Sequence, residues 1–294
     1  MSYLITGANG QVGLSLTNLC CEKSISHQSF NSSDFDITNF CEAKKTAFSI
    51  RPSLIINTAA YTNVDGAETN ESNSSAVNYV GVKNLTKICN DLSIPLIHIS
   101  TDYVFDGKSS TPYKETDPTS PINIYGKTKL EGEKYIQEYC ESFIIVRTSS
   151  IFSRYGNNFF KTILKLASTY NELKIISDQM VRPTYAMDLA NALITISNFI
   201  INNKFKNNIF HYAGNQTCSW YEFASTILEV NNTFSSKKYS GSIIPIPSEK
   251  YVQAAKRPIF SALDSKLICD TFQIKPSNWM AAIPEILKKL EASN

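Results

Sequence analysis

Tyr125 and Lys129 are the side chains whose types and spacing first suggest chemistry in this sequence. They stand four positions apart in "YGKTK", so both would project from the same face of a helix. An ammonium group beside a phenol stabilises the phenolate and lowers the tyrosine pKa from its usual value of about 10. Two polar side chains also share a helix face by chance in many proteins. The interpretation therefore depends on what else the chain places nearby.

Thr101 is a third candidate for the same chemistry. It directly follows "PLIHIS" (95–100), an apolar run that predicts a strand, and doubly wound sheets bind ligands at the carboxyl ends of their strands. A hydroxyl there could bond a carbonyl oxygen and orient it for proton transfer, although a turn cap is the ordinary alternative for a threonine. The segment "SPINIYGKTKLEGEKYIQEY" (120–139) predicts the helix that carries Tyr125 and Lys129, with its start at the Ser-Pro pair.

A glycine-rich loop follows the first apolar run. In "YLITGANGQVG" (3–13), Gly7, Gly10 and Gly13 stand between a predicted strand and a predicted helix, together with Gln11 and Val12. Glycines at such a junction let the backbone approach a pyrophosphate, which meets free N–H groups at the helix N-terminus. The context predicts that this loop binds a dinucleotide, and a tight turn with close helix packing is the alternative.

The residues expected to hold the adenosine ribose leave the cofactor open. An acidic residue about 20 positions after the glycines would favour NADH, but the second strand ends at "FNSS" (30–33) with neither a carboxylate nor an arginine. Both NADPH and NADH are compatible, with a lean to NADPH because no carboxylate would repel a 2′-phosphate. Asp36 and Ile37 could reach the adenine edge, and a helix-capping role is equally expected for Asp36.

Short apolar runs alternate with helix-length segments along the first half of the chain. The predicted strands are 3–5, 26–30, 53–57, 95–100 and 142–148. The central runs are continuously apolar, as expected for strands that helices cover on both faces of a parallel sheet. The predicted fold is α/β, a doubly wound parallel sheet of Rossmann type, followed after about residue 150 by a second, smaller α/β domain across a crevice.

Composition excludes several other classes of protein. The chain has 294 residues, 43% of them hydrophobic, and 28 basic against 26 acidic side chains without basic runs, so neither nucleic acid nor a membrane is expected as a partner. No apolar segment reaches the ~20 residues of a membrane span and no leader is evident, which favours a cytoplasmic location. The seven cysteines form no CxxC pair and the three histidines no HxxxH pair. They are interpreted as buried thiols and as structural or surface histidines, with no metal site.

An ordered series of motifs resembles the extended short-chain dehydrogenase/reductases, and among them the reductases of nucleotide-linked keto sugars. The matching stretches are "TGANGQVG" (6–13), "NTAAYTNVDGAE" (57–68), "VNYVGVKNL" (77–85), "STDYVFDG" (100–107), "ETDPTSPINIYGKTKLEGE" (115–133), "RTS" (147–149), "DQMVRPTYAMDLA" (178–190) and "RPIFSALDSKL" (257–267). They span nearly the whole chain in order, which is far more specific than any one motif.

The resemblance implies a set of site residues. Thr101, Tyr125 and Lys129 would be catalytic, and Ala59, Ala60 and Tyr61 would join the glycine loop around the cofactor. The candidates for contacts with the sugar nucleotide are Thr101, Asp102, Gln179, Arg182 and Arg257, whereas Trp220 and Tyr221 are expected in the core. The cofactor domain would comprise 1–150 with about 188–219 and 256–273, and the substrate domain about 151–187, 220–255 and 274–294.

The implied reaction is NAD(P)H-dependent reduction of the 4-keto group of dTDP-4-dehydro-L-rhamnose to dTDP-L-rhamnose, for polysaccharide synthesis. Ser150, Val181 and Arg182 depart from the usual pattern of these reductases and leave the exact sugar and base open. An epimerase/reductase for a related keto sugar and a non-catalytic nucleotide-binding subunit remain alternatives. A dehydratase is disfavoured, because Asp102 is followed by Tyr103 rather than Glu. A homodimer is a further expectation, without the bridging metal of some relatives, because Ser15 and its neighbours offer no acid.

Overall fold

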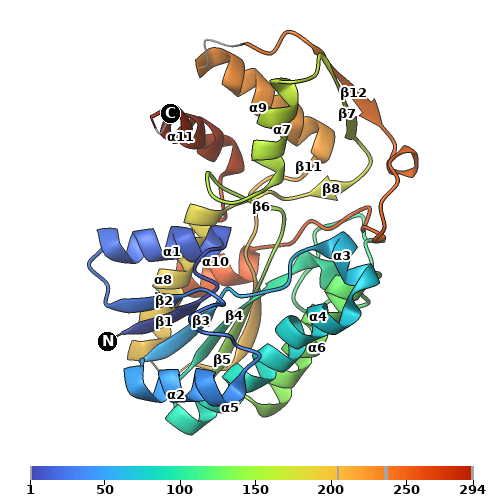
Figure 1. The fold of residues 1–294 in the computed structure, drawn as a ribbon. Helices are drawn as coiled ribbons and strands as arrows, with labels where there is room; N and C mark the ends of the chain where they lie inside the picture. The colour runs from blue at the N-terminus through green and yellow to red at the C-terminus, as the bar shows by residue number, and fades with distance from the viewer. Residues whose placement is uncertain (1, 204, 235–237, 293–294) are drawn as a thin grey trace.

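A parallel sheet between two layers of helices forms the larger part of the molecule (Figure 1). The computed structural model describes residues 2–203, 205–234 and 238–292. Within them the sheet has six strands in the order β10-β5-β4-β3-β1-β2. Their bounds are β1 (Tyr3–Thr6), β2 (His27–Phe30), β3 (Leu54–Asn57), β4 (Leu96–Thr101), β5 (Phe143–Thr148) and β10 (Asn208–His211). Every neighbouring pair is parallel, so the predicted doubly wound sheet is confirmed.

Helices bury both faces of this sheet, which explains why its central strands are apolar throughout. The helices on one face are α1 (Gln11–Glu22), α8 (Ala186–Asn202) and α10 (Lys266–Phe272). Those on the other are α2 (Phe40–Ile50), α5 (Val82–Leu92) and α6 (Ile124–Tyr139). The order reverses at β1, which has β2 on one side and β3 on the other, and such a reversal opens a crevice at the carboxyl ends of the strands.

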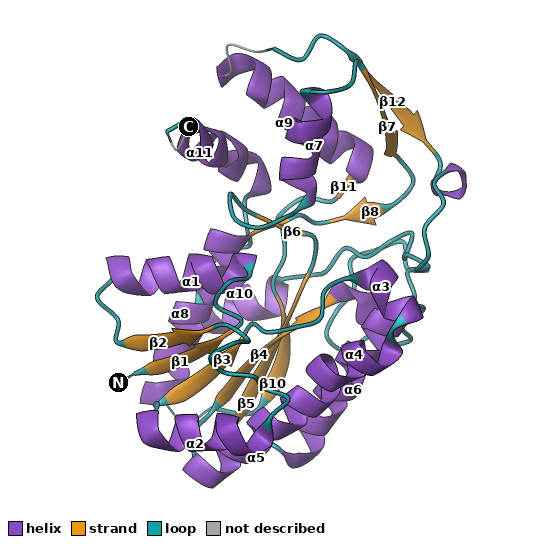
Figure 2. Cartoon of the chain, in the orientation of Figure 1, coloured by secondary structure: helices purple, strands orange, loops and turns teal. Residues whose placement is uncertain are grey.

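A second, smaller part has a hydrophobic core of its own and lies beyond the carboxyl ends of the sheet strands (Figure 2). Its main elements are α7 (Phe159–Ala167), α9 (Trp220–Phe234), α11 (Trp279–Glu291) and the parallel pair β7 (Glu172–Ile176) and β12 (Ser242–Ile246). Where the chain passes from one part of the molecule to the other it forms strands of two residues. These are β6 (Ile151–Phe152), β8 (Met180–Val181), β9 (Thr184–Tyr185) and β11 (Cys218–Ser219). Phe152, Phe223 and Trp279 meet edge to face in this core.

Short elements form the edge of the larger part next to α6. They are α3 (Val64–Thr69), α4 (Glu71–Ser75), the π-helical turn η1 (Ala76–Gly81) and the 3₁₀ turn η2 (Asp102–Val104). A further 3₁₀ turn, η3 (Ser248–Lys250), follows β12 in the smaller part, where Ser248 donates to Asp178. Asn78 of η1 is buried and ties this edge together, because its side chain bonds both backbone groups of Tyr61 and the hydroxyl of Thr128 on α6.

Helix α6 begins at Ile124, later than the sequence predicted. The side chain of Asn123 accepts a hydrogen bond from the Gly126 N–H at 2.8 Å, so Asn123 is the N-cap and the Ser-Pro pair lies before the helix. A Cβ on Gly126 would come within 2.1 Å of the Tyr103 carbonyl oxygen. Glycine at this position therefore lets α6 pack directly against η2, the turn that follows β4.

The cysteines are all free thiols, but the prediction that they are buried is wrong for two of them, and Cys269 is only half-buried. Cys21 and Cys41 are exposed on the outer faces of α1 and α2. In the described part of the chain, no helix is long and apolar enough to cross a membrane. The same residues contain no cluster of three metal-binding side chains.

A buried ion pair fixes α6 to the end of β5. Arg147 on β5 donates from Nη2 to Glu133 Oε2 at 2.7 Å and from Nε to Oε1 at 2.9 Å, and both side chains are almost inaccessible to water. The guanidinium also lies 5.2 Å from the centre of the Phe105 ring. Removing one partner of such a pair leaves an unpaired buried charge, which is strongly destabilising.

We expect Glu133→Ala to lower the free energy of unfolding by about 3–5 kcal/mol in urea denaturation, because Arg147 would keep its charge without a counter-ion. Glu71→Ala is the matched control, since Glu71 pairs with Lys127 of the same helix with about half of each side chain exposed. That variant should unfold almost as the unmodified protein does. Equal losses from the two variants would contradict a special role for the buried pair.

Candidate active site

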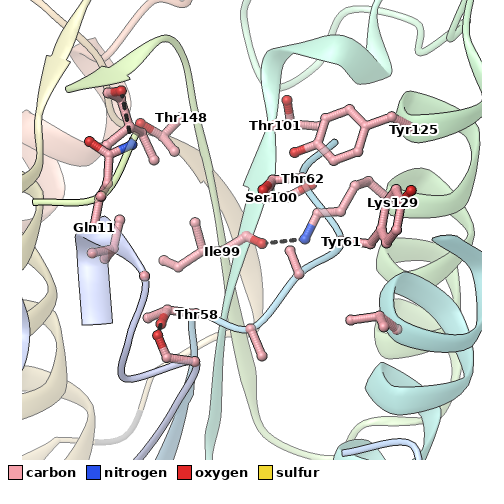
Figure 3. Close-up of a pocket in the computed structure, with 18 of the residues that line it drawn as sticks. Gln11, Thr58, Tyr61, Thr62, Ile99, Ser100, Thr101, Tyr125, Lys129 and Thr148 are labelled. Carbon is pink, nitrogen blue, oxygen red and sulfur yellow. Dashed lines mark hydrogen bonds between the residues drawn. The ribbon is translucent and has the colours of Figure 1, made fainter. Parts of the chain in front are cut away.

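A cavity of about 930 Å³ lies at the carboxyl ends of β1, β3, β4 and β5, with α7 and α9 of the smaller part across from the sheet. Its volume is at the upper end of the range for small-molecule and cofactor sites. Figure 3 shows Thr101, Tyr125 and Lys129 on one side and Gln11 and Thr148 on the other. The predicted site residues in its lining are Gly7, Gly10, Gln11, Val12, Asp36, Ile37, Ala59, Ala60, Tyr61, Thr101, Asp102, Tyr125, Lys129 and Arg257.

The glycine loop forms one end of the cavity. Gly7 has a φ of +70°, and a Cβ there would lie 2.6 Å from the Ala59 backbone nitrogen. Gly13 lies inside α1 and does not line the cavity; a Cβ there would lie 2.2 Å from the Gly7 carbonyl oxygen. The helix starts after Gly10 without a side-chain cap, which leaves its first N–H groups available to a ligand. These features fit the pyrophosphate of a dinucleotide.

Gln11 and Tyr61 line the cavity, and hydrogen bonds hold both residues in place. The Gln11 amide accepts from Ser153 and Asn158 at 2.9 Å, so the first turn of α1 is tied to the segment that leads into α7. Tyr61 follows β3, and its backbone is held by Asn78. The cavity walls are therefore cross-linked by hydrogen bonds from both parts of the molecule.

The end of β2 provides polar residues without a carboxylate. Asn31 and Ser32 line the cavity there. Asp36 lines it too, but its carboxylate accepts from the N–H and the hydroxyl of Thr38 at 2.9 and 2.8 Å, so it closes a turn. The cap of α2 is Asn39, so the helix-capping alternative for Asp36 is wrong.

Thr101 and Tyr125 lie side by side where β4 meets α6 (Figure 3). Thr101 ends β4; its hydroxyl accepts from the Tyr103 N–H at 3.2 Å and donates to Asp102 at 3.0 Å, so it also caps η2. Burial raises the pKa of Tyr125, and a hydrogen bond with Thr101 lowers it by less. The phenol therefore holds its proton throughout the neutral range.

The pKa of Tyr125 is raised in this structure, whereas the sequence predicted that Lys129 would lower it. The side-chain nitrogen of Lys129 donates to the Ile99 carbonyl oxygen at 2.6 Å (Figure 3), and burial of the phenol dominates the pKa of Tyr125. Burial also lowers the pKa of Lys129 to about 8, against an opposing effect of Glu133 one turn further along α6. The same desolvation thus favours the neutral form of both side chains.

Buried polar atoms without a partner gather at this cavity. In the described chain they include Ser100 Oγ, Asp102 Oδ2 and Arg257 Nε, and all three residues line the cavity. Burial raises the pKa of Asp102 to about 6. Unpaired buried polar atoms are costly, so their concentration at one place indicates a ligand with several polar groups.

Two predicted substrate residues lie outside the cavity lining. Gln179 is buried elsewhere, and the guanidinium of Arg182 donates to the Leu263 carbonyl and the Thr217 hydroxyl. Arg257 does line the cavity, where it forms an ion pair with Asp65 at 2.7 Å and approaches the Tyr103 hydroxyl at 3.4 Å.

Trp220 packs against the core of the smaller part, as predicted, and it also lines the cavity, which was not predicted. It begins α9 and packs against Phe159, which begins α7, with ring centres 4.5 Å apart. Phe159 and Asn158 were not predicted as site residues, because "YGNNFF" (155–160) carries no motif. Two helix starts in the smaller part thus present an aromatic wall opposite the sheet.

A sequence model described as RmlD substrate binding domain matches residues 1–292. The chain belongs to this family. The resemblance drawn from the motifs is therefore confirmed. An RmlD-family relative from Aggregatibacter actinomycetemcomitans, named dTDP-4-dehydrorhamnose reductase, is 40% identical over 96% of this chain and 97% of its own length.

Solved structures agree with this RmlD assignment. A dTDP-4-dehydrorhamnose reductase from Clostridium acetobutylicum superimposes with a TM-score of 0.91 at 33% identity, covering 99% of this chain and 100% of that one. The enzyme of that name from Bacillus anthracis, in complex with NADP, gives a TM-score of 0.89 at 32% identity, covering 98% and 99%.

We expect Gly13→Ala to lower the free energy of unfolding by about 1–3 kcal/mol, because a methyl group would press on the Gly7 carbonyl oxygen. Gly10→Ala is the matched control, since its Cβ would lie 3.2 Å from that same oxygen. Thermal or urea unfolding without ligand measures the difference. A Gly13→Ala protein as stable as Gly10→Ala would refute the close contact between α1 and the loop.

Proposed function

We propose that this chain reduces the 4-keto group of dTDP-4-dehydro-L-rhamnose to give dTDP-L-rhamnose, using NADPH or NADH. One observation carries the proposal: Thr101, Tyr125 and Lys129 line the same cavity as the glycine loop. The names of relatives that match nearly the whole chain support the substrate, and the NADP complex of one of them supports the cofactor. The product would serve the synthesis of rhamnose-containing polysaccharides.

The cofactor would lie along the carboxyl edge of the sheet. Its pyrophosphate would meet the glycine loop and the start of α1, and its adenosine end would face Asn31, Ser32 and Ile37. Ala59, Ala60 and Tyr61 would border the middle, and Lys129 would donate to the ribose next to the nicotinamide. The bound reduced nicotinamide supplies the hydride.

Tyr125 would supply the proton that the reduction requires. Its raised pKa keeps the phenol protonated, and the oxygen of the reduced carbonyl needs a proton as negative charge develops on it. The Thr101 hydroxyl, which donates to Asp102 in this structure, would hold the carbonyl oxygen in place by donating its proton to that oxygen instead. Lys129 follows four residues later on α6, and its ammonium form would stabilise the phenolate that remains.

The smaller part would bind the sugar nucleotide. Its aromatic wall of Phe159 and Trp220 faces the sheet side of the cavity, where a planar base can stack. The unpartnered oxygen of Asp102 would accept a hydrogen bond from a sugar hydroxyl, and Arg257 would donate hydrogen bonds to a phosphate. Gln179 and Arg182 are left out of this assignment because they do not line the cavity.

A cytoplasmic location is part of the proposal. All seven cysteines are free, and Cys21 and Cys41 are exposed, as suits a reducing compartment. Assembly as a homodimer, which the resemblance implied, stays a prediction that light scattering on the purified protein can test.

We expect Tyr125→Phe to reduce turnover of dTDP-4-dehydro-L-rhamnose by about 10²–10⁴-fold, because the proton donor is lost while the ring remains. Loss of NADPH absorbance measures the rate. Tyr135→Phe is the matched control: Tyr135 lies on the same helix outside the cavity lining, and this variant should keep full activity.

Equal rates for Tyr125→Phe and the unmodified protein would remove this tyrosine from the mechanism. Binding of NADPH and substrate without turnover would favour the non-catalytic alternative. Formation of a product with a different configuration at a second carbon would favour the epimerase/reductase.

We expect Ser32→Asp to lower kcat/KM for NADPH about tenfold or more and to affect NADH much less, because a carboxylate would repel the 2′-phosphate and accept from the 2′-OH. Ser33→Asp is the matched control, since Ser33 is exposed next to it but does not line the cavity. An unchanged ratio of the two cofactors in Ser32→Asp would place the adenosine ribose elsewhere.

A further inference from the structure

A row of buried polar side chains runs beneath the cavity across three neighbouring strands and ends at Lys129. Thr6 ends β1, Asn57 ends β3, His98 lies within β4 and Lys129 reaches in from α6; all four are almost completely buried. The Thr6 hydroxyl donates to Asn57 Oδ1 at 2.6 Å, Asn57 Nδ2 lies 2.9 Å from His98 Nδ1, and His98 Nε2 lies 3.3 Å from Lys129 Nζ.

The backbone N–H of Ala59 fixes the direction of this row. It donates to Asn57 Oδ1 at 3.1 Å, and a backbone N–H cannot accept a hydrogen bond. The amide oxygen of Asn57 must therefore face Ala59 and Thr6, and its NH₂ group must face His98. A reversed amide would place two donors against each other at Ala59.

His98 consequently has its proton on Nε2. Nδ1 accepts from the Asn57 amide, so it cannot carry a proton, and an imidazolium, which carries one on each nitrogen, is excluded. Burial and the nearby Lys129 also hold the pKa of His98 well below its usual range. The ring therefore presents an N–H donor to Lys129 Nζ.

Lys129 completes the row as an acceptor. Its nitrogen already donates to the Ile99 carbonyl oxygen at 2.6 Å. An ammonium has only donors, so its N–H would face the His98 N–H without an acceptor between them. A neutral amine can donate to Ile99 and accept from His98 at the same time. The hydrogen bonds around Nζ thus favour the amine.

We propose that His98 is a positioning residue that donates its Nε2–H to Lys129, stabilises the neutral amine, and so sets the pH above which the reductase loses activity. The hydrogen-bond assignment stands on geometry alone, and the effect on activity rests on the proposed function. Because Lys129 must be charged to stabilise the phenolate, activity falls as pH rises through the pKa of Lys129, about 8.

Other ionisable groups surround Lys129 and act on the same equilibrium. Glu133 on α6 favours the ammonium, but Arg147 on β5 pairs with it. The remaining ionisable side chains in the cavity lining are Asp36, Tyr61, Asp102, Tyr103, Tyr125 and Arg257. None of these is a direct hydrogen-bond partner of Nζ in the described structure, whereas His98 is.

The tautomer of His98 is testable without substrate. The chain has three histidines, so long-range ¹H–¹⁵N spectra of ¹⁵N-histidine-labelled protein from about pH 6 to pH 9 will be resolved, and the signal missing from His98→Gln assigns His98. We expect a protonated Nε2 and a bare Nδ1 that do not titrate. A proton on Nδ1, or an imidazolium within this range, would overturn the proposal.

Two variants test whether His98 lowers the pKa of Lys129, one by adding a charge and the other without adding any. In Asn57→Asp a carboxylate would accept from His98 Nδ1–H, so that Nε2 becomes an acceptor for the ammonium. His98→Gln can offer an amide oxygen to Nζ without adding charge. For both we expect the upper pH limit of kcat/KM to move up by about one unit or more.

The outcomes are separable. A shift in Asn57→Asp alone would be an effect of added charge and would overturn the proposal, as would unchanged pH profiles in both variants. If one variant does not fold, the other and the tautomer of the unmodified protein decide. Absence of reductase activity with His98 as the Nε2–H tautomer would refute the proposed function and leave the hydrogen-bond assignment in place.

Discussion

The contact between the start of α6 and the turn after β4 is the constraint on which the site depends. Gly126 allows it, because any side chain there would collide with the Tyr103 carbonyl. The buried pair of Glu133 and Arg147 holds the middle of the same helix against β5. Tyr125 lies next to the first contact and Lys129 between the two, so both take their direction from a helix fixed at two points.

Desolvation governs the chemistry of this arrangement more than the attraction between neighbours does. Burial raises the pKa of Tyr125 and Asp102 and lowers that of Lys129 and His98. All four shifts favour the neutral form, as expected where water is excluded. A site of this kind keeps its proton donor protonated, and its positive charge comes from the ammonium form of Lys129 and the guanidinium of Arg257.

The sequence predicted the elements that repeat a strong local pattern. The apolar strands, the glycine loop and the shared helix face of Tyr125 and Lys129 follow from local patterns in the sequence. The grouping of Thr101 with this pair came from the family resemblance. Contacts made by residues far apart in the chain could not be read in this way. Trp220 and Phe159 meet only because two helices of the smaller part begin side by side, and Arg182 is withdrawn by partners at 217 and 263. The pKa of Tyr125 depends on burial, which spacing does not reveal.

The two separate hydrophobic cores have a consequence for how ligands affect the whole molecule. Opposite walls of the cavity belong to different cores, and the Gln11 side chain joins them through its hydrogen bonds with Ser153 and Asn158. A ligand that contacts both walls bridges the two parts of the molecule, and its binding free energy adds to the stability of the folded state. A ligand that binds the folded chain and not the unfolded one therefore raises the temperature at which the protein unfolds.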